Sequence, residues 1–133
     1  MKSKTKKNKL SPENIIVFFL NMLNTVKLYH WKTKSFAQHK STDQLYSELN
    51  ENIDKFVEVL LGITQKRANL LNTKYIPLND YPSLFLFKKK IDSYIYFLKQ
   101  MNSISLFHNT DLLNIRDEIL GNLNQFKYLL TFY

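Results

Sequence analysis

Apolar residues recur at intervals of three and four over four stretches of the chain, which predicts four amphipathic helices. The first helix begins at Ser11-Pro12-Glu13, where a serine cap, a proline in the first turn and an acid near the positive end of the helix dipole favour a helix start. Its apolar stripe is formed by Ile16, Phe19, Leu23 and Val26. His30 continues this stripe by one turn, and we therefore expect it to face the core.

A longer second helix follows, with Ser41 or Thr42 as its candidate N-cap. Its apolar stripe comprises Leu45, Leu49, Ile53, Phe56, Leu60, Ile63 and Leu70. Two prolines interrupt the pattern between residues 72 and 82, and a third helix is expected over residues 83–102. After a loop at 103–109, a fourth helix begins at Thr110 or Asp111 and runs almost to the C-terminus.

The helical pattern predicts an all-α four-helix bundle that forms one domain over residues 11–133. Two glycines and three prolines in 133 residues provide few sites for tight turns, which argues against a β-sandwich or barrel. The absence of cysteine excludes disulfides and thiolate metal ligands, so a metal site would consist of histidine, carboxylate and water.

The net charge of +8 is concentrated at the N-terminus, because residues 1–10 carry five lysines and no acid. We expect this segment to be a flexible arm whose lysines contact DNA phosphates, although it lacks aromatic residues that could stack on bases. The lysines are Lys2, Lys4, Lys6, Lys7 and Lys9. The apolar run that follows, at residues 15–20, is too short to cross a membrane, which needs about 20 residues. A cytoplasmic protein with no membrane partner is expected.

Four possible metal ligands lie on the second helix, at His39, Asp43, Asp54 and Glu58. At about 100° per residue, all four fall on one stripe, within about 60° of Asp43. Asp43 and Asp54 are nevertheless roughly 16 Å apart along the helix axis, at about 1.5 Å per residue, which is far beyond the reach of one ion. One helix therefore cannot close a metal site.

The four positions are nearly mirror-symmetric about Glu48 and Leu49, so an antiparallel copy of the helix would solve this problem. A two-fold axis there would bring His39 and Asp43 opposite the second copy's carboxylates, with His30 completing each of two equivalent sites. Two imidazoles and three carboxylates suit iron, because nitrogen ligands tolerate Fe(II) and hard oxygens favour Fe(III).

These residues also carry a family resemblance, in HWKTKSFAQH at residues 30–39, DQLY at 43–46, and Asp54 and Glu58. The pattern resembles the ferroxidase signature of Dps proteins, the mini-ferritins that protect DNA from oxidative damage. The resemblance implies a ferritin-like subunit of a dodecamer that oxidises iron, with hydrogen peroxide as oxidant, and stores Fe(III), holding at most two ions per site. It assigns His30, His39 and Asp43 as ligands from one subunit, and Asp54 and Glu58 from the two-fold mate.

The resemblance also suggests that Trp31 donates electrons to oxidising intermediates, although packing is the more frequent role of such a residue. Tyr46 is expected to pack, and His108 to be structural or exposed. Dps proteins usually separate the two histidines by more than the nine residues found here, so we expect a tighter turn with the ligands retained. Such compact variants are similar to those of phages and large DNA viruses, which would also permit a location in the virion.

Two other interpretations remain open. The first is a DNA-compacting shell protein with a vestigial metal site, and the second is a structural bundle that dimerises through its second helix. The body of the chain also has few acids outside the site, so iron storage is less secure than oxidation. The ferritin type of centre is excluded, because no histidine has an acid three positions before it.

Overall fold

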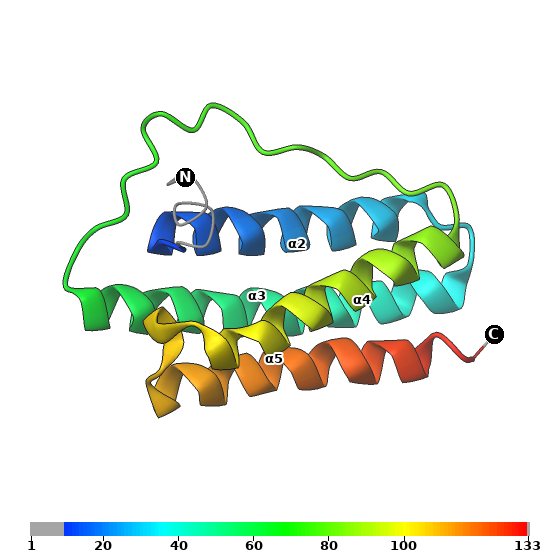
Figure 1. Cartoon of the computed structure of the whole chain (residues 1–133). Coiled ribbons are helices and arrows are strands. Elements are labelled where there is room, and N and C mark those ends of the chain that lie inside the picture. Colours follow the sequence, from blue (N-terminus) through cyan, green and yellow to red (C-terminus); the bar gives the residue numbers. More distant parts are fainter. Residues whose placement is uncertain (1–9, 133) are drawn as a thin grey trace, which may run out of the picture.

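The computed structural model describes residues 10–132, and in this range the chain is all-helical (Figure 1). It contains four α-helices and two short 3₁₀ turns, which lie between the last two helices. The elements are α2 (Pro12–Lys32), α3 (Phe36–Thr64), α4 (Leu84–Gln100), η1 (Met101–Ser103), η2 (Ser105–Phe107) and α5 (Thr110–Leu129). The prediction of four helices in an all-α fold is therefore confirmed. No helix in the described part of the chain is long and apolar enough to span a bilayer.

Serine caps begin three of the four helices. The hydroxyls of Ser11, Ser35 and Ser83 each accept a hydrogen bond of 3.2 Å from the backbone N–H three residues later. The prediction that α3 starts at Ser41 or Thr42 is wrong, because both residues are buried inside the helix. Their hydroxyls donate to the carbonyl of Gln38, the backward bond that serine and threonine make within helices.

The end of α3 also differs from the prediction, because the helix stops at Thr64 and does not reach Leu70. Gln65 closes it in the left-handed conformation, with φ of 58°, and its N–H donates to the carbonyl of Leu61. The apolar stripe ends with the helix, since Ile63 is already 40% exposed. Residues 65–83 form a crossover without regular secondary structure, longer than the predicted break at 72–82.

The crossover contacts α2 near the start, the middle and the end of that helix. It runs along the whole length of α2 and leads to the beginning of α4 (Figure 1). The contacts join Asn69 N–H to Glu13 (2.9 Å), Asn21 to the Pro77 carbonyl (3.1 Å) and the Asn79 side chain (2.7 Å), and Lys32 to Asp80 (3.1 Å).

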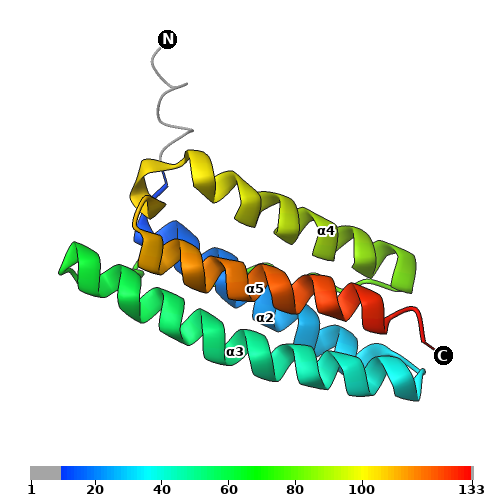
Figure 2. The same ribbon diagram turned by 90° about the horizontal axis from the view of Figure 1, so that it is seen from below.

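A single core runs through the middle of the four helices, with α3 packed against both α2 and α5 (Figure 2). Aromatic rings connect the elements across this core. The Phe19 and Phe56 rings meet edge to face at 5.2 Å, and the Tyr29 and Phe87 rings stack at 4.2 Å. The face of α3 that carries Leu45, Leu49 and Ile53 is thus fixed inward, so its opposite face is directed outward.

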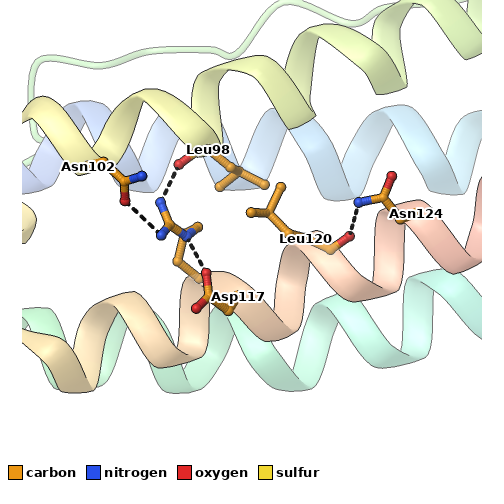
Figure 3. A network of polar contacts seen from close by, with 6 residues as sticks. Leu98, Asn102, Asp117, Leu120 and Asn124 are labelled. Atoms are coloured by element: carbon orange, nitrogen blue, oxygen red, sulfur yellow. Dashed lines mark hydrogen bonds and ion pairs between the residues drawn. The ribbon is translucent and has the colours of Figure 1, made fainter.

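Arg116 of α5 joins that helix to the end of α4 from a buried position (Figure 3). Its guanidinium donates to the Leu98 carbonyl (2.7 Å), to the Asn102 side-chain oxygen (2.9 Å) and to the Asp117 carboxylate (2.8 Å). Leu98 lies in the last turn of α4, where its carbonyl accepts from the N–H of the cap residue Met101, and the guanidinium supplies a second donor. Each of the three guanidinium nitrogens makes a hydrogen bond, so this buried charge has a structural role.

Candidate metal-binding residues on α3

His30 and His39 form a stacked pair where α2 turns into α3. Their ring centroids are 3.9 Å apart and the ring planes differ by 17°. His30 is buried, as its place in the apolar stripe predicted, and His39 is half-buried. The pair brings together the two imidazoles that the sequence analysis assigned to one subunit.

Each histidine is oriented by the backbone of the other. His30 Nδ1 lies 2.9 Å from the His39 carbonyl oxygen, and His39 Nδ1 lies 3.0 Å from the His30 carbonyl oxygen. A carbonyl can only accept, so both Nδ1 atoms carry the proton and donate. In the neutral rings both Nε2 atoms are then unprotonated, which is the tautomer that binds metals with Nδ1 fixed by a backbone carbonyl.

Thr42 adds a second acceptor for His30. Its hydroxyl oxygen lies 3.0 Å from His30 Nδ1, and its own hydrogen is directed to the Gln38 carbonyl at 2.8 Å. Thr42 is completely buried, so this arrangement is shielded from water. The sequence analysis treated Thr42 as a helix cap and missed this role.

The turn between α2 and α3 has only three residues, 33–35, and Gln38 locks it. The Gln38 side-chain oxygen accepts from the Tyr29 hydroxyl (3.1 Å) and from the Thr33 hydroxyl (2.6 Å). Burial raises the pKa of Tyr29, which keeps its hydroxyl protonated as a donor. A turn of this length places His39 beside His30, so an interval of nine residues is compatible with the pair, as expected.

Asp43, Asp54 and Glu58 are exposed on α3. Asp43 borders a groove together with Leu129 and Phe132 of the C-terminal segment. Since α3 is unbroken from Phe36 to Thr64, Asp43 and Asp54 stand roughly 16 Å apart along its axis. The structure therefore places Asp43 one turn from His39 but does not bring the other two carboxylates to the histidine pair.

The two distant carboxylates have different surroundings. Asp54 borders a groove between α2 and α3 that is lined mainly by apolar residues, including Leu20 and Val57. Glu58 lines an open hollow of about 610 Å³ together with Lys66 and Arg67 of the crossover. Within residues 10–132 no group of three or more histidine or acidic side chains could hold a metal ion. One chain thus supplies two separate groups of candidate ligands.

Three further predicted residues are placed by the structure. Trp31 is 70% exposed. The prediction that its main role is packing is therefore wrong for the core of its own chain. Lys27 lies over the rings of both Trp31 and Tyr46, and Tyr46 packs against the core as expected. His108 is exposed and its Nε2 lies 3.1 Å from the Asn102 carbonyl oxygen, in agreement with the prediction. The arm lysines Lys2, Lys4, Lys6, Lys7 and Lys9 lie outside the described residues.

The fold and these residues define an all-helical protein with an oriented histidine pair at one end of a long helix. A family of unknown function, DUF5856, has a sequence model that matches residues 30–130. The match covers more than half of the chain, so the protein belongs to this family. The matched region begins at His30 and includes every residue assigned above as a metal ligand.

A phage protein is similar to this chain. The chain is 35% identical over 119 residues to an uncharacterized 14.6 kDa protein in the mobD-ri intergenic region of Enterobacteria phage T4, and 85% of each chain is covered. No solved structure matches.

Proposed function

We propose that this protein is a ferroxidase subunit of the Dps type. In this proposal the four helices form a ferritin-like bundle that binds Fe(II) between two copies of the chain, oxidises it and stores Fe(III). The observation that carries the proposal is the reciprocal pairing of His30 and His39, which leaves both Nε2 atoms unprotonated and places the pair beside a helix on which Asp43 follows His39 by one turn.

The other half of the site would come from a second copy of α3 in the reverse direction. With a two-fold axis at the level of Glu48 and Leu49, the partner subunit's Asp54 and the partner subunit's Glu58 would lie beside His39 and Asp43. The exposure of these carboxylates and the unbroken course of α3 support this arrangement. Each dimer would then contain two equivalent sites.

The chemistry follows from the donor set. Two Fe(II) ions each give one electron to hydrogen peroxide, whose O–O bond breaks, and two protons complete two water molecules. The imidazoles bind Fe(II), while the carboxylates favour Fe(III) and balance its additional charge. Trp31, exposed beside His30, is available in this proposal to donate an electron to oxidising intermediates.

The proposal is tested with the double variant Asp54→Ala/Glu58→Ala. It should lose nearly all peroxide-dependent Fe(II) oxidation, measured as the initial rate by stopped-flow absorbance. The control is Asp111→Ala/Glu118→Ala, which removes two exposed carboxylates from α5, away from the ligand stripe of α3, and should retain the initial rate. Unchanged oxidation in the first variant would refute the proposal.

A second activity, DNA binding through the lysine arm, is supported by the five lysines within the first ten residues. If twelve chains assemble into a shell, many arms would act together and bind phosphates with high avidity. Deleting residues 1–10 should then abolish retardation of duplex DNA and leave ferroxidation intact. A protein of this kind would act in the cytoplasm in association with the genome, and the phage relative supports a viral source.

A further inference from the structure

The outward face of α4 carries exposed aromatic rings among lysines. Phe85 and Tyr96 are 67% and 66% exposed, and they lie on the same side of the helix because eleven residues correspond to about three complete turns. Lys89 lies between them, with its Nζ 5.3 Å from the centre of the Phe85 ring. Lys88 and Lys99 are exposed on the same helix.

The charge of this region is strongly positive. Helix α4 contains four lysines and one acid, Asp92. The four lysines and one acid give α4 a net charge of +3, and Lys127 of α5 pairs with that acid at 2.7 Å, so Asp92 does not stand as a free negative charge among the lysines. A partner with regularly spaced negative charges is therefore favoured.

We propose that this face of α4, defined by Phe85, Lys88, Lys89, Tyr96 and Lys99, binds single-stranded nucleic acid. The lysines would contact phosphates while the two rings stack on unpaired bases, the combination by which proteins hold single strands without reading their sequence. Phe85 and Tyr96 are about 16 Å apart along the helix, so a strand lying along α4 reaches both rings. This surface is independent of the ferroxidase proposal, because α4 lies across the molecule from α3 (Figure 2).

Other occupants fit this face less well. A second copy of the same face would bring two helices of net charge +3 together, and these repel each other. An anionic membrane would require an apolar stripe to insert, but the apolar stripe of α4 is already buried in the core, through Phe87, Ile91 and Leu98. Duplex DNA keeps its bases stacked on one another and leaves the two rings without a partner.

The test compares fluorescein-labelled oligo-dT with an abasic strand of equal length and with a duplex, by anisotropy with the full-length protein. Phe85→Ala/Tyr96→Ala should weaken binding to oligo-dT by roughly five-fold or more for each ring removed, and leave binding to the abasic strand unchanged. The matched control Tyr75→Ala/Tyr128→Ala removes two exposed rings from other surfaces and should bind like wild type. Tyr96→Phe retains a ring and should also bind like wild type.

The lysines are tested through salt dependence. Lys89→Gln/Lys99→Gln should weaken binding to both strands, and the slope of log affinity against log salt should fall by about 0.7 for each lysine removed. Circular dichroism establishes that the variants are folded. The lysine arm is present in every variant and contributes equally.

Three results would overturn the proposal. The first is equal binding of oligo-dT by wild type and by Phe85→Ala/Tyr96→Ala. The second is wild-type protein that binds the abasic strand as tightly as oligo-dT. The third is an aromatic variant that still binds oligo-dT but has lost another interaction. That interaction would be either self-association, measured by sedimentation, or binding to phosphatidylserine vesicles.

Discussion

Both ends of α3 carry candidate metal ligands, but the two ends are built differently. At the N-terminal end His39 is held against His30 by two backbone carbonyls, and Gln38 fixes the turn beneath them. Toward the C-terminal end Asp54 and Glu58 are exposed on the helix surface. The chain therefore orders one half of the proposed site by itself and leaves the other half on an open surface, where a second copy can reach it.

The two ends of α3 should therefore differ in their contribution to stability as well as to function. Changes at the histidine end should affect both the folding free energy and metal binding, because those groups are buried and hydrogen-bonded. Changes at the carboxylate end should affect only metal binding and oxidation.

Gln38→Ala should have the largest effect. The substitution leaves the Tyr29 and Thr33 hydroxyls without their common acceptor, at a cost of about 1–3 kcal/mol for a buried unsatisfied group. Urea unfolding followed by circular dichroism measures this cost. Gln44→Ala is the control. Gln44 is exposed, and its side chain donates a hydrogen bond to the Glu48 side chain on the surface of the same helix. Equal stability of the two variants would contradict a locked turn.

Thr42→Val should cost about 1 kcal/mol, because it keeps the shape of the side chain and removes one acceptor for His30. His30 retains the His39 carbonyl, so its tautomer should survive with a less rigid ring. Loss of such a supporting contact typically weakens metal affinity about 10-fold or more. Anaerobic Fe(II) titration by calorimetry measures the affinity, and tight binding equal to wild type would argue against a supporting role for Thr42.

Asp54→Ala/Glu58→Ala should change the stability of the single chain by less than about 0.5 kcal/mol, since both side chains are exposed. Its oxidation rate should nevertheless collapse. The same unfolding experiment, performed without iron, measures the stability. A large loss of stability in the isolated chain would mean that these carboxylates support the fold, and the contrast between the two ends would fail.

The smallest effect on stability is expected at Glu13. Its carboxylate accepts a hydrogen bond from the N–H of Asn69 and so holds the crossover against α2, near the carboxylate end of α3. This hydrogen bond is the main reason that the pKa of Glu13 lies below its usual value. Ionised Glu13 therefore stabilises the folded chain at pH values above the pKa of glutamate in the unfolded chain, about 4.3. This stabilisation is lost as the pH falls through the lower pKa that Glu13 has in the folded chain. Glu13→Gln should reduce the loss of thermal stability between pH 6 and about pH 3. An unchanged pH profile would contradict this role.

The sequence predicted the fold well where capping and periodicity agreed. Ser11 and the stripe ending at His30 located α2 and the inward histidine. The start of α3 was missed because its first two turns, residues 36–42, are mostly polar and their serine and threonine resemble caps. Its end was missed because Gln65, a residue with no preference for positive φ, closes the helix, and apolar residues continue beyond it.

The candidate site was predictable in its residues but not in its construction. Helical spacing alone placed His39, Asp43, Asp54 and Glu58 on one stripe. The reciprocal bonds between His30 and His39 depend on the exact reversal at residues 33–35, which no local pattern encodes. The exposed rings of α4 lie outside the apolar stripe of that helix, and helical periodicity does not indicate what a ring outside the stripe contacts.

Complementation between two variants tests whether each site is shared between two chains. His39→Ala destroys one half of the site and Asp54→Ala/Glu58→Ala destroys the other, so each homodimer should be inactive. A co-expressed, doubly tagged heterodimer of the two variants contains one complete site and one that lacks both halves. It should recover about half of the wild-type rate of peroxide-dependent Fe(II) oxidation, because one of two sites is intact. A heterodimer as inactive as its parents would contradict the account.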